Sequence, residues 1–550
     1  MKTLLSRFKL APLLTLEVLT ASFFISLLNL ALPVFVIQLL NRFVSHGFSG
    51  TLYTLTSGVV IAIILQYCFQ LVRTALLSQM NEEPDRILEQ DVLHTLSTAK
   101  FGAVVRFSRE QIANIMSDIR KVQAGWEPPN IIPLLDVPFV LLYLLALAFL
   151  SPTLALIALI GTFIGLAAGA YSIVKNNQLA EQMAQIFVRY RNHELTALNT
   201  PETIRAFNGT GYLTAIREKN LQHLSTLRQR LAFRREQSSS LMMTIGSLQS
   251  VIIYSAGAIL VVQGELSVGV LIGANILASR SFQSIARLFR SIHLLKQSSK
   301  SKTVLDELAK LPSEQSEGIA IKQYSGRLRL QDVGFGYIGT STPLFESLTL
   351  DVQQGEILAV TGNNGTGKTT LIRLAAGLLE CSRGDILADD INLKQMAKPW
   401  WRRQIIYLPQ EPTFFLASIR DNILLGEQVD DAMLNRVVLE AGLRDFLDRS
   451  AKGIETVISD PAAIPPGIRK RIALARALMT EGPLVLFDEP TVGLDQDGCR
   501  TIYSLLNRCT QDGKTIIVSS NDPHLIKAAN VLLDLNRKPV PQITQPNAAE

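Results

Sequence analysis

The chain has 550 residues, of which 48% are hydrophobic and only 18% are charged, and its mean hydropathy is +0.24. It is too long for one ordinary domain and too apolar for an ordinary soluble protein, which excludes a disordered chain and a simple soluble enzyme. The four cysteines, Cys68, Cys381, Cys499 and Cys509, show neither CxxC pairs nor metal-ligand spacing. We therefore expect no zinc site and no disulfide scaffold, and a reduced, cytosol-facing protein is the simplest interpretation.

The net charge of +6 is unevenly distributed along the chain. Residues 1–300 hold 26 lysines and arginines against 16 acidic residues, a net +10, whereas residues 301–550 hold 27 against 31, a net −4. The basic excess lies in the half that also carries long uncharged runs. It indicates the basic bias of cytoplasmic membrane loops and not a nucleic-acid surface.

The uncharged runs of the first half are long enough for membrane helices, each of which needs roughly 20 apolar residues. Spans one and two are expected on either side of Arg42, in residues 18–41 and 43–72. Residues 137–174 predict spans three and four with a turn at residues 151–152, and span three begins slightly before Asp136. Span five lies between Glu236 and Glu265, and span six follows at once. The pattern predicts six helices in a membrane domain of residues 1–298.

The loops between these spans alternate in length and charge. Residues 43–51, 151–152 and 264–267 are short and nearly uncharged, whereas residues 81–128 and 175–236 are long, and the second long loop has ten basic against five acidic residues. Three basic residues, Lys2, Arg7 and Lys9, precede span one. The N-terminus and both long loops are therefore expected in the cytoplasm. A secretory signal peptide in residues 1–26 is the alternative, but the apolar run continues to Leu40 without a small-residue cleavage site.

Two charged residues fall inside or near predicted spans. Asp136 lies early in span three and Arg280 lies well inside span six. Charges at such depth usually face a bundle interior or an aqueous path, and the alternative is that each side chain extends to the membrane interface. Arg280 is the better candidate for the translocation path.

After a polar linker, residues 299–325, the sequence predicts a second domain at 326–538 and a disordered tail at 539–550. Residues 355–360 read as a buried strand, and a GxxxxGK[ST] motif follows it and opens a helix. In this motif backbone N–H groups surround the phosphates of ATP, Lys368 reaches the β and γ oxygens, and the Thr369 hydroxyl ligates Mg²⁺. The predicted ATP-binding residues of the motif are Gly362, Asn363, Asn364, Gly365, Thr366, Gly367, Lys368, Thr369 and Thr370.

A second phosphate-chemistry element is the apolar run from Leu484, which ends in two carboxylates, Asp488 and Glu489. Asp488 is expected to hold Mg²⁺ and Glu489 to polarise the attacking water. Acids that merely end a strand are the alternative, which the nearby GxxxxGK[ST] motif disfavours. The second domain is therefore predicted to bind and hydrolyse ATP.

These motifs resemble an ABC transporter nucleotide-binding domain, and the whole chain resembles an ABC exporter half-transporter. The resemblance implies a six-helix α-helical transmembrane domain fused to an α/β P-loop ATPase domain. It also implies that Tyr337 stacks on adenine, although a plain strand aromatic is the alternative. By the same resemblance Gln410 contacts Mg²⁺ and the membrane domain, and Asp495 belongs to the D-loop.

Three membrane-half segments, residues 28–47, 197–208 and 274–288, resemble the permease/ATPase subunits of bacterial type I secretion systems. This resemblance implies a multi-pass protein of the bacterial inner membrane, a polypeptide substrate, a membrane-fusion adaptor and an outer-membrane channel. It places short coupling helices near residues 108–117 and 192–203. Some members carry an N-terminal peptidase domain, and too few residues precede span one here for that domain to be expected.

The chain departs from the family at two positions that contact phosphate. The LSGGQ signature is replaced by Ile464, Pro465, Pro466, Gly467 and Ile468, which removes the serine hydroxyl and two backbone N–H donors. Proline suits a helix start, so the following helix is still expected. The switch histidine is replaced by Asn521, which is shorter and cannot carry the positive charge that strengthens a hydrogen bond. Losing one such donor typically costs about 10² to 10³ in rate.

In the family each ATP lies between the Walker motifs of one chain and the signature of the other. The sequence therefore favours a heterodimer with a second, intact ABC half over a homodimer in which every site holds both defects. An ATP-driven exporter of a polypeptide is the leading hypothesis. A nucleotide-binding structural or regulatory subunit with little hydrolysis and a small-molecule or lipid exporter are the alternatives.

Overall fold

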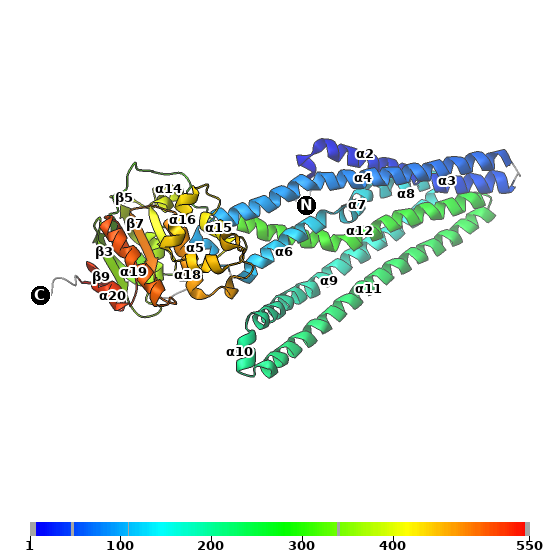
Figure 1. Cartoon of the computed structure of the whole chain (residues 1–550). Coiled ribbons are helices and arrows are strands. Elements are labelled where there is room, and N and C mark those ends of the chain that lie inside the picture. Colours follow the sequence, from blue (N-terminus) through cyan, green and yellow to red (C-terminus); the bar gives the residue numbers. More distant parts are fainter. Residues whose placement is uncertain (1–6, 46–48, 108, 338–341, 545–550) are drawn as a thin grey trace. The chain divides into compact units, whose positions relative to one another are not determined.

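The computed structural model of the chain describes residues 7–45, 49–107, 109–337 and 342–544. It divides into two compact units, one of Met1–Ser97 and Phe107–Lys310 and the other of Thr98–Arg106 and Leu311–Glu550. The first unit is built of long helices and the second of two sheets with helices around them (Figure 1). A helical membrane-type domain joined to an α/β domain is the predicted fold class, and it is confirmed.

The first unit contains ten α-helices and two short irregular helices in its described residues. These are α2 (Pro12–Leu28), α3 (Ala31–Gln38), η1 (Leu39–Val44), α4 (Ser49–Thr98), α6 (Arg109–Trp126), α7 (Pro128–Asp136), η2 (Val137–Phe139), α8 (Val140–Leu150), α9 (Pro152–Asn199), α10 (Pro201–Ala206), α11 (Thr210–Val262) and α12 (Val268–Leu308).

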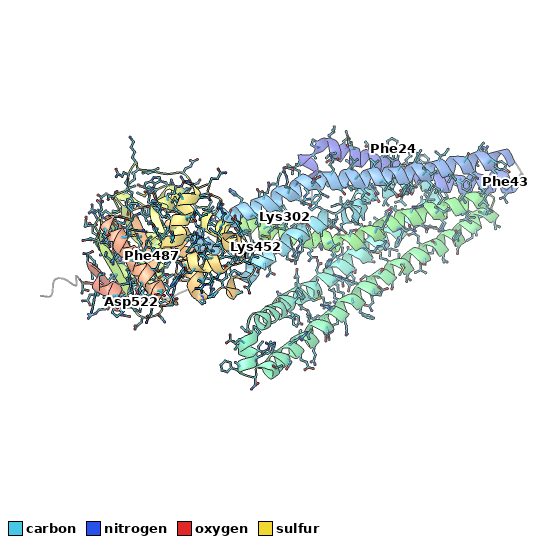
Figure 2. The ribbon with its side chains drawn as sticks, in the orientation of Figure 1. Phe24, Phe43, Lys302, Lys452, Phe487 and Asp522 are labelled. Carbon is cyan, nitrogen blue, oxygen red and sulfur yellow. The ribbon has the colours of Figure 1, made fainter. Side chains whose placement is uncertain are left out.

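Five helical segments of the described chain are long and apolar enough to cross a membrane: Pro12–Val44, Leu52–Thr98, Pro128–Leu150, Pro152–Phe187 and Thr210–Val262. The sixth predicted span lies in α12, which is 41 residues long but is not among these apolar segments. Apolar side chains such as Phe24 lie on the outer surface of these helices, as a lipid-facing surface requires, whereas Phe487 is fully buried in the second unit (Figure 2).

Two serines explain the tight turns between neighbouring spans. Ser151 precedes α9 and its hydroxyl accepts a hydrogen bond from the Leu154 N–H, while Pro152 occupies the first helical position. Ser267 caps α12 in the same way through the Val270 N–H. The turns expected at residues 151–152 and 264–267 are therefore confirmed.

Asp136 forms a buried ion pair inside the membrane unit. The Arg73 Nη1 atom lies 2.7 Å from Asp136 Oδ1 and 3.3 Å from Ser22 Oγ, and the two charged side chains are 6% and 13% exposed. The pair joins α4 to α7 and to α2. Asp136 therefore faces the bundle interior and does not extend to the interface. Arg280 is half-buried on α12 and forms no ion pair with the described residues, so its place on a translocation path stays a prediction.

A second polar network fixes the start of the chain. The Arg7 guanidinium donates to Asp85 Oδ1 at 2.6 Å and to Asn81 Oδ1 at 3.1 Å, and it lies 4.8 Å from the centre of the Trp126 ring. The Asn81 side chain donates in turn to the Trp126 carbonyl at 2.6 Å. These contacts attach the N-terminal segment to α4 and α6. Arg7, one of the three basic residues that precede span one, therefore has structural partners.

The second unit contains a four-stranded sheet in the order β2-β1-β4-β5 and a six-stranded sheet in the order β10-β9-β3-β8-β7-β6. The smaller sheet is antiparallel, and the larger is parallel except for β10. The strands are β1 (Leu328–Phe335), β2 (Phe345–Val352), β3 (Ile357–Thr361), β4 (Arg383–Ala388), β5 (Ile391–Asn392), β6 (Ile405–Leu408), β7 (Leu484–Asp488), β8 (Thr515–Ser519), β9 (Val531–Asp534) and β10 (Gln542–Thr544).

Nine α-helices of this unit lie in the described residues, and several of them pack on the parallel sheet, whose central strands are buried on both faces as such sheets require. They are α5 (Phe101–Val104), α13 (Lys368–Ala375), α14 (Lys398–Arg403), α15 (Ile419–Leu424), α16 (Asp431–Glu440), α17 (Arg444–Arg449), α18 (Pro466–Leu478), α19 (Gln496–Gln511) and α20 (Pro523–Lys527), with short turns η3 (Gly453–Glu455) and η4 (Pro461–Ala463).

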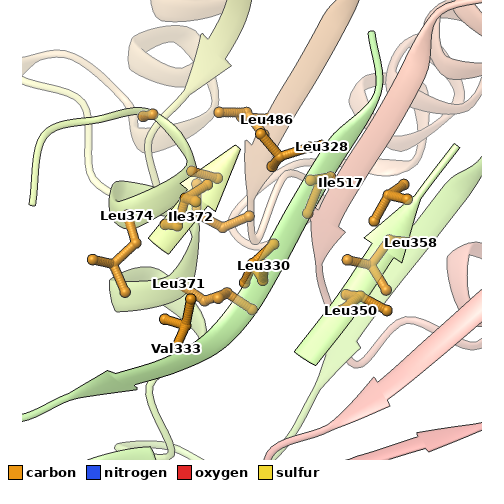
Figure 3. Close-up of a cluster of buried hydrophobic side chains, with 14 of the residues drawn as sticks. Leu328, Leu330, Val333, Leu350, Leu358, Leu371, Ile372, Leu374, Leu486 and Ile517 are labelled. Atoms are coloured by element: carbon orange, nitrogen blue, oxygen red, sulfur yellow. The ribbon is translucent and has the colours of Figure 1, made fainter. Parts of the chain in front are cut away.

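One core cluster binds the two sheets of this unit to α13. Leu330 and Val333 of β1 pack with Leu371 and Ile372 of α13 and with Leu486 of β7 (Figure 3). All five side chains are at most 3% exposed. This packing fixes α13 and the loop before it relative to the ends of the parallel strands.

Three boundaries differ from the sequence prediction. The helix α12 runs to Leu308, into the segment predicted as a linker, because Leu305 and Leu308 are buried. Residues 542–544 of the predicted disordered tail form β10 against β9, and residues 545–550 lie outside the described chain. Of the short helix predicted near residues 108–117, residue 108 lies outside the described chain and residues 109–117 belong to the longer helix α6, while a separate short helix, α5, occupies Phe101–Val104. The second short helix, α10, overlaps the predicted range.

We expect Asp136→Asn to lower the melting temperature of the detergent-solubilised chain, because Arg73 is then left as a buried charge without its carboxylate. Breaking a buried pair typically costs about 3 to 5 kcal/mol, which corresponds to a shift on the order of 10 °C.

The matched control is Arg86→Gln, which removes an exposed pair with Glu83 and should change stability by about 1 kcal/mol at most. Equal shifts for the two variants would contradict a structural role for the Arg73–Asp136 pair.

Candidate nucleotide-binding site

Glycines shape the loop between β3 and α13. Gly362, Gly365 and Gly367 have φ values of 149°, 82° and 112°, which side chains other than glycine rarely adopt. Gly367 ends the loop as the residue before α13. These glycines let the loop turn tightly into the start of α13, and in this motif such a loop and helix start bind phosphate oxygens.

Lys368 lies between the loop and the end of β7. Its Nζ atom is 2.6 Å from the Gly362 carbonyl oxygen and 3.1 Å from Glu489 Oε1, and the residue is 7% exposed. The Glu489 backbone has a φ of 47°, and its N–H donates to the Ser519 carbonyl at 3.0 Å. A phosphate bound in the loop would therefore compete with the Glu489 carboxylate for the same ammonium group.

The predicted metal ligands supply suitable oxygens at this edge of the sheet. Asp488 is 1% exposed; the Ser519 hydroxyl donates to its Oδ1 at 2.5 Å, and its Oδ2 has no hydrogen-bond partner among the described residues. The Thr369 hydroxyl lies 3.3 Å from Gln410 Oε1. One carboxylate with neutral oxygens suits Mg²⁺, which takes its other ligands from phosphate and water. The described residues contain no cluster of three or more His, Cys, Asp and Glu that could form a metal site from protein ligands alone.

Tyr337 lies beside the same helix. Its hydroxyl is 2.9 Å from the Thr370 hydroxyl, and its ring meets the Phe335 ring edge-on at 5.0 Å between centroids. The side chain is 42% exposed. The geometry is compatible with an adenine contact, which stays a prediction.

Asn521 follows β8 and forms a two-way pair with the first glycine of the loop. Its Nδ2 donates to the Gly362 carbonyl at 3.1 Å, and its Oδ1 accepts from the Gly362 N–H at 3.3 Å. A histidine ring presents its two nitrogens in diverging directions and does not match this pair. The side chain that replaces the switch histidine therefore binds the backbone of its own loop.

The segment that replaces the signature begins α18. Pro465 precedes the helix and Pro466 is its first residue, so the predicted helix start is confirmed. The Arg469 N–H bonds to the Pro465 carbonyl at 3.0 Å. With two prolines in place, Gly467 and Ile468 carry the backbone N–H groups left for a phosphate at this helix start.

Lys470 is a residue that the sequence prediction did not include. It is 4% exposed, and its Nζ donates to the carbonyl oxygens of Glu489 at 2.5 Å and Val492 at 2.9 Å. It thereby joins α18 to the turn that carries Glu489. Burial lowers the pKa of the Lys470 ammonium to about 8, against the opposing effect of the Glu489 and Asp488 carboxylates. Its position on the apolar face of α18, one turn before Leu474, was the available sequence signal.

Asp495 lies next to the same helix. The Arg471 Nη2 atom is 2.9 Å from Asp495 Oδ1, and the Asp495 carboxylate caps α19 by accepting from the Gly498 N–H at 2.8 Å. This backbone hydrogen bond, together with Arg471, holds the pKa of the Asp495 carboxyl below its usual value. The predicted D-loop residue thus connects α18 to α19.

Two protein-family models match this chain. The model "ABC transporter transmembrane region" matches residues 15–285, and the model "ABC transporter" matches residues 345–492. The chain belongs to the ABC transporter family. It is an ABC exporter with a multi-pass membrane domain and an ATP-binding domain that drives transport.

Relatives and a solved structure agree with this assignment. The exporter is 24% identical over 533 residues to the Toxin RTX-III translocation ATP-binding protein of Actinobacillus pleuropneumoniae and 26% identical over 539 residues to the Leukotoxin translocation ATP-binding protein LktB of Mannheimia haemolytica; each match covers 95% of this chain and 74% of the relative. A bacterial Atm1-family ABC exporter with ATP bound has the same fold, with a TM-score of 0.82 at 19% identity, over 96% of this chain and 94% of that one. The resemblance to type I secretion subunits is confirmed.

We expect Lys470→Met to destabilise the ATPase unit by roughly 1 to 3 kcal/mol, because the buried carbonyls of Glu489 and Val492 lose their donor. Lys470→Gln keeps an N–H donor and should lose less. The measurement is the melting temperature of the full chain in detergent. A methionine variant as stable as the glutamine variant would show that the hydrogen bonds from Lys470 to Glu489 and Val492 do not stabilise the unit.

The Lys470 ammonium also predicts a pH dependence with a defined sign. Its pKa is about 8 in the folded chain and 10.5 as the unperturbed reference. Between these values the unfolded chain binds one more proton, so stability increases as pH rises through this window and decreases as pH falls through 8. The melting temperature of the wild type minus that of Lys470→Gln should therefore increase from about pH 7 to about pH 9.5, and a decrease would exclude a buried ammonium.

Proposed function

We propose that this exporter is a subunit of a type I secretion system and moves a polypeptide across the bacterial inner membrane. The support is the similarity to toxin translocation ATP-binding proteins along 95% of the chain. In this proposal the membrane domain is residues 1–298, the ATPase domain is 326–538, and the N-terminus and the ATPase domain are cytoplasmic. The basic long loops support this orientation.

We further propose specific roles for the residues at the strand ends. Lys368 and the loop N–H groups bind the β and γ phosphates of ATP, while Thr369, Gln410 and Asp488 hold Mg²⁺, which shields the phosphate charge. Glu489 accepts a proton from the attacking water. Two observations support these roles. The buried Asp488 Oδ2 atom has no hydrogen-bond partner among the described residues, and Lys368 and Glu489 form a buried ion pair.

The exporter is also proposed to pair with a second, different ABC half. The observation that carries this step is the contrast within one chain between the buried Lys368–Glu489 pair and a signature helix that starts with two exposed prolines. In a heterodimer this chain's Walker residues would face an intact signature. A membrane-fusion adaptor and an outer-membrane channel complete the proposed assembly, by analogy with the secretion systems that the sequence resembles.

A nucleotide-binding regulatory subunit with little hydrolysis is the second candidate. The hydrogen bonds between the Asn521 side chain and both backbone groups of Gly362 favour the regulatory subunit, because the Asn521 amide is then already engaged and does not face a phosphate. The two candidates differ in whether Glu489 supports ATP hydrolysis when the partner chain supplies an intact signature.

We expect the purified chain alone to hydrolyse ATP slowly, because each homodimer site would lack both the signature donors and the switch histidine. Each lost donor typically costs about 10² to 10³ in rate. Robust turnover of the chain alone that Glu489→Gln abolishes and the exposed control Glu481→Gln retains would refute the heterodimer proposal.

Restoring the missing groups in the same assay separates the two defects. Pro465→Ser with Pro466→Gly returns a hydroxyl and two N–H donors, and Asn521→His returns a chargeable donor. We expect the combined variant to exceed either partial variant. No gain in any of them, with ATP binding intact, would favour the regulatory subunit.

Polypeptide export is tested in the producing cells. Deleting the gene should remove a protein from the medium while its intracellular amount is maintained, and the wild-type chain should restore export. Glu489→Gln distinguishes the candidates: a hydrolysing exporter subunit loses restoration, whereas a regulatory subunit keeps it. An unchanged set of extracellular proteins after deletion would refute the secretion role.

A further inference from the structure

A cavity of about 810 Å³ lies within the membrane unit, among α9, α11 and α12. These helices contact one another, and α9 and α11 run side by side (Figure 1). The volume is in the range of pockets that hold small molecules. Along α11 the lining extends from Arg235 to Ser250, about 22 Å at the helical rise of 1.5 Å per residue.

A stripe of glycines on α9 builds one wall. A Cβ atom at Gly165 would lie 2.7 Å from the Phe282 ring, and one at Gly169 would lie 2.4 Å from the Phe289 ring. Both rings belong to α12 and line the cavity. The glycines let α12 approach closely, so the two rings are fixed as an apolar wall.

The far end is closed by Gln249, which is 4% exposed. Its Nε2 donates to the Ala278 carbonyl at 3.3 Å, and its Oε1 lies against Gly161, where a Cβ atom would be 2.4 Å away. Met242 and Met243 line the stretch of α11 before it. The Gln249 Oε1 atom has no hydrogen-bond partner among the described residues, so this end is polar. The methionines before it provide an apolar stretch that is adaptable in shape.

The opposite end is cationic. Arg235, Arg290 and His293 line it, and no aspartate or glutamate is among the described lining residues. Arg235 Nη2 donates to His293 Nε2 at 2.8 Å, which orients the guanidinium. Neither arginine forms an ion pair with the described residues. Each guanidinium carries five N–H donors, so both can bind a carboxylate or phosphate.

Neutral polar groups lie between the two ends. The Asn176 amide donates to the Ser172 hydroxyl at 3.2 Å, and the Ser172 and Ser238 hydroxyls contact each other. Ser238 and Ser239 precede Met242 and Met243 on α11, and Ser247, Gln249 and Ser250 follow them. The apolar stretch of this helix therefore lies between two polar stretches, of which only the one at Arg235 is cationic. An anionic head at Arg235 and an apolar tail along the methionines match this arrangement.

We propose that this cavity binds an amphiphilic anion, with its carboxylate or phosphate held by Arg235 and Arg290 and its acyl chain against Met242 and Phe282. The cavity length exceeds the roughly 15 Å depth of one leaflet's hydrocarbon, half of the ~30 Å core, so a full acyl chain fits. A free fatty acid and an anionic phospholipid share this chemistry. The site is separate from the proposed polypeptide substrate and stands without it.

The test measures equilibrium binding of radiolabelled oleate and of phosphatidylglycerol to the full chain in neutral detergent, with phosphatidylcholine, whose zwitterionic headgroup has no net charge, as the comparison. The double variant Arg235→Gln/Arg290→Gln should weaken binding at least tenfold, roughly the loss of one charge-assisted hydrogen bond. The matched control is Arg234→Gln/Arg287→Gln, which removes the same charge from the same helices outside the cavity.

Weakened binding of oleate alone identifies a free acid as the ligand, and weakened binding of phosphatidylglycerol alone identifies a lipid. Ser239→Trp keeps both arginines, narrows the cavity, and should weaken the same ligand if the double variant is misfolded. Unchanged affinity in both cavity variants, equal binding of phosphatidylcholine, or no saturable binding of either anion would overturn the proposal.

Discussion

The parallel register of β8 between β3 and β7 positions every group of the nucleotide site. Ser519 is the Cα partner of both Val360 and Asp488, and its hydroxyl and carbonyl bond to Asp488 and to the Glu489 N–H. Two residues later Asn521 reaches Gly362. A shift of one residue in this register would turn these side chains to the other face of the sheet, so the site depends on the pairing of buried strands that contain only Asp488 among its proposed ligands.

Local patterns in the sequence predicted the parts of the fold whose cause is local. The apolar run to Phe487, the glycine loop and the proline at the start of α18 each determine structure within a few residues. Arg73 was taken only as the end of a span, because its partner Asp136 is 63 residues away. The position of α5 was missed for the same reason, since the bridge of Ala99 to Ser313 just before it joins residues far apart in the chain. The strand β10 was missed although it pairs with β9, its neighbour in the sequence.

The candidate site also contains residues that local motifs predict and contacts that only the fold reveals. Lys368, Asp488 and Glu489 could be assigned from motifs, but the contact between Lys368 and Glu489 required the fold. Lys470 lies in a basic stretch typical of a surface, and burial of its ammonium depends on carbonyls 19 and 22 residues further on. Glu489 therefore lies between two lysines, one bound to its carboxylate and one to its carbonyl, which fixes the turn despite its left-handed backbone.

In the dimer arrangement of the family, the two departures would act on different nucleotides. Asn521 lies beside this chain's own loop, whereas Pro465 and Pro466 lie at the start of α18, the element that in the family contacts the partner's ATP. Each missing donor costs about 3 to 4 kcal/mol of transition-state stabilisation when it acts alone. A homodimer would combine both losses in every site, while a heterodimer would place one in each. Glu489 and Lys368 remain buried and paired. This is expected for a chain whose own ATP site is completed by the signature of another chain.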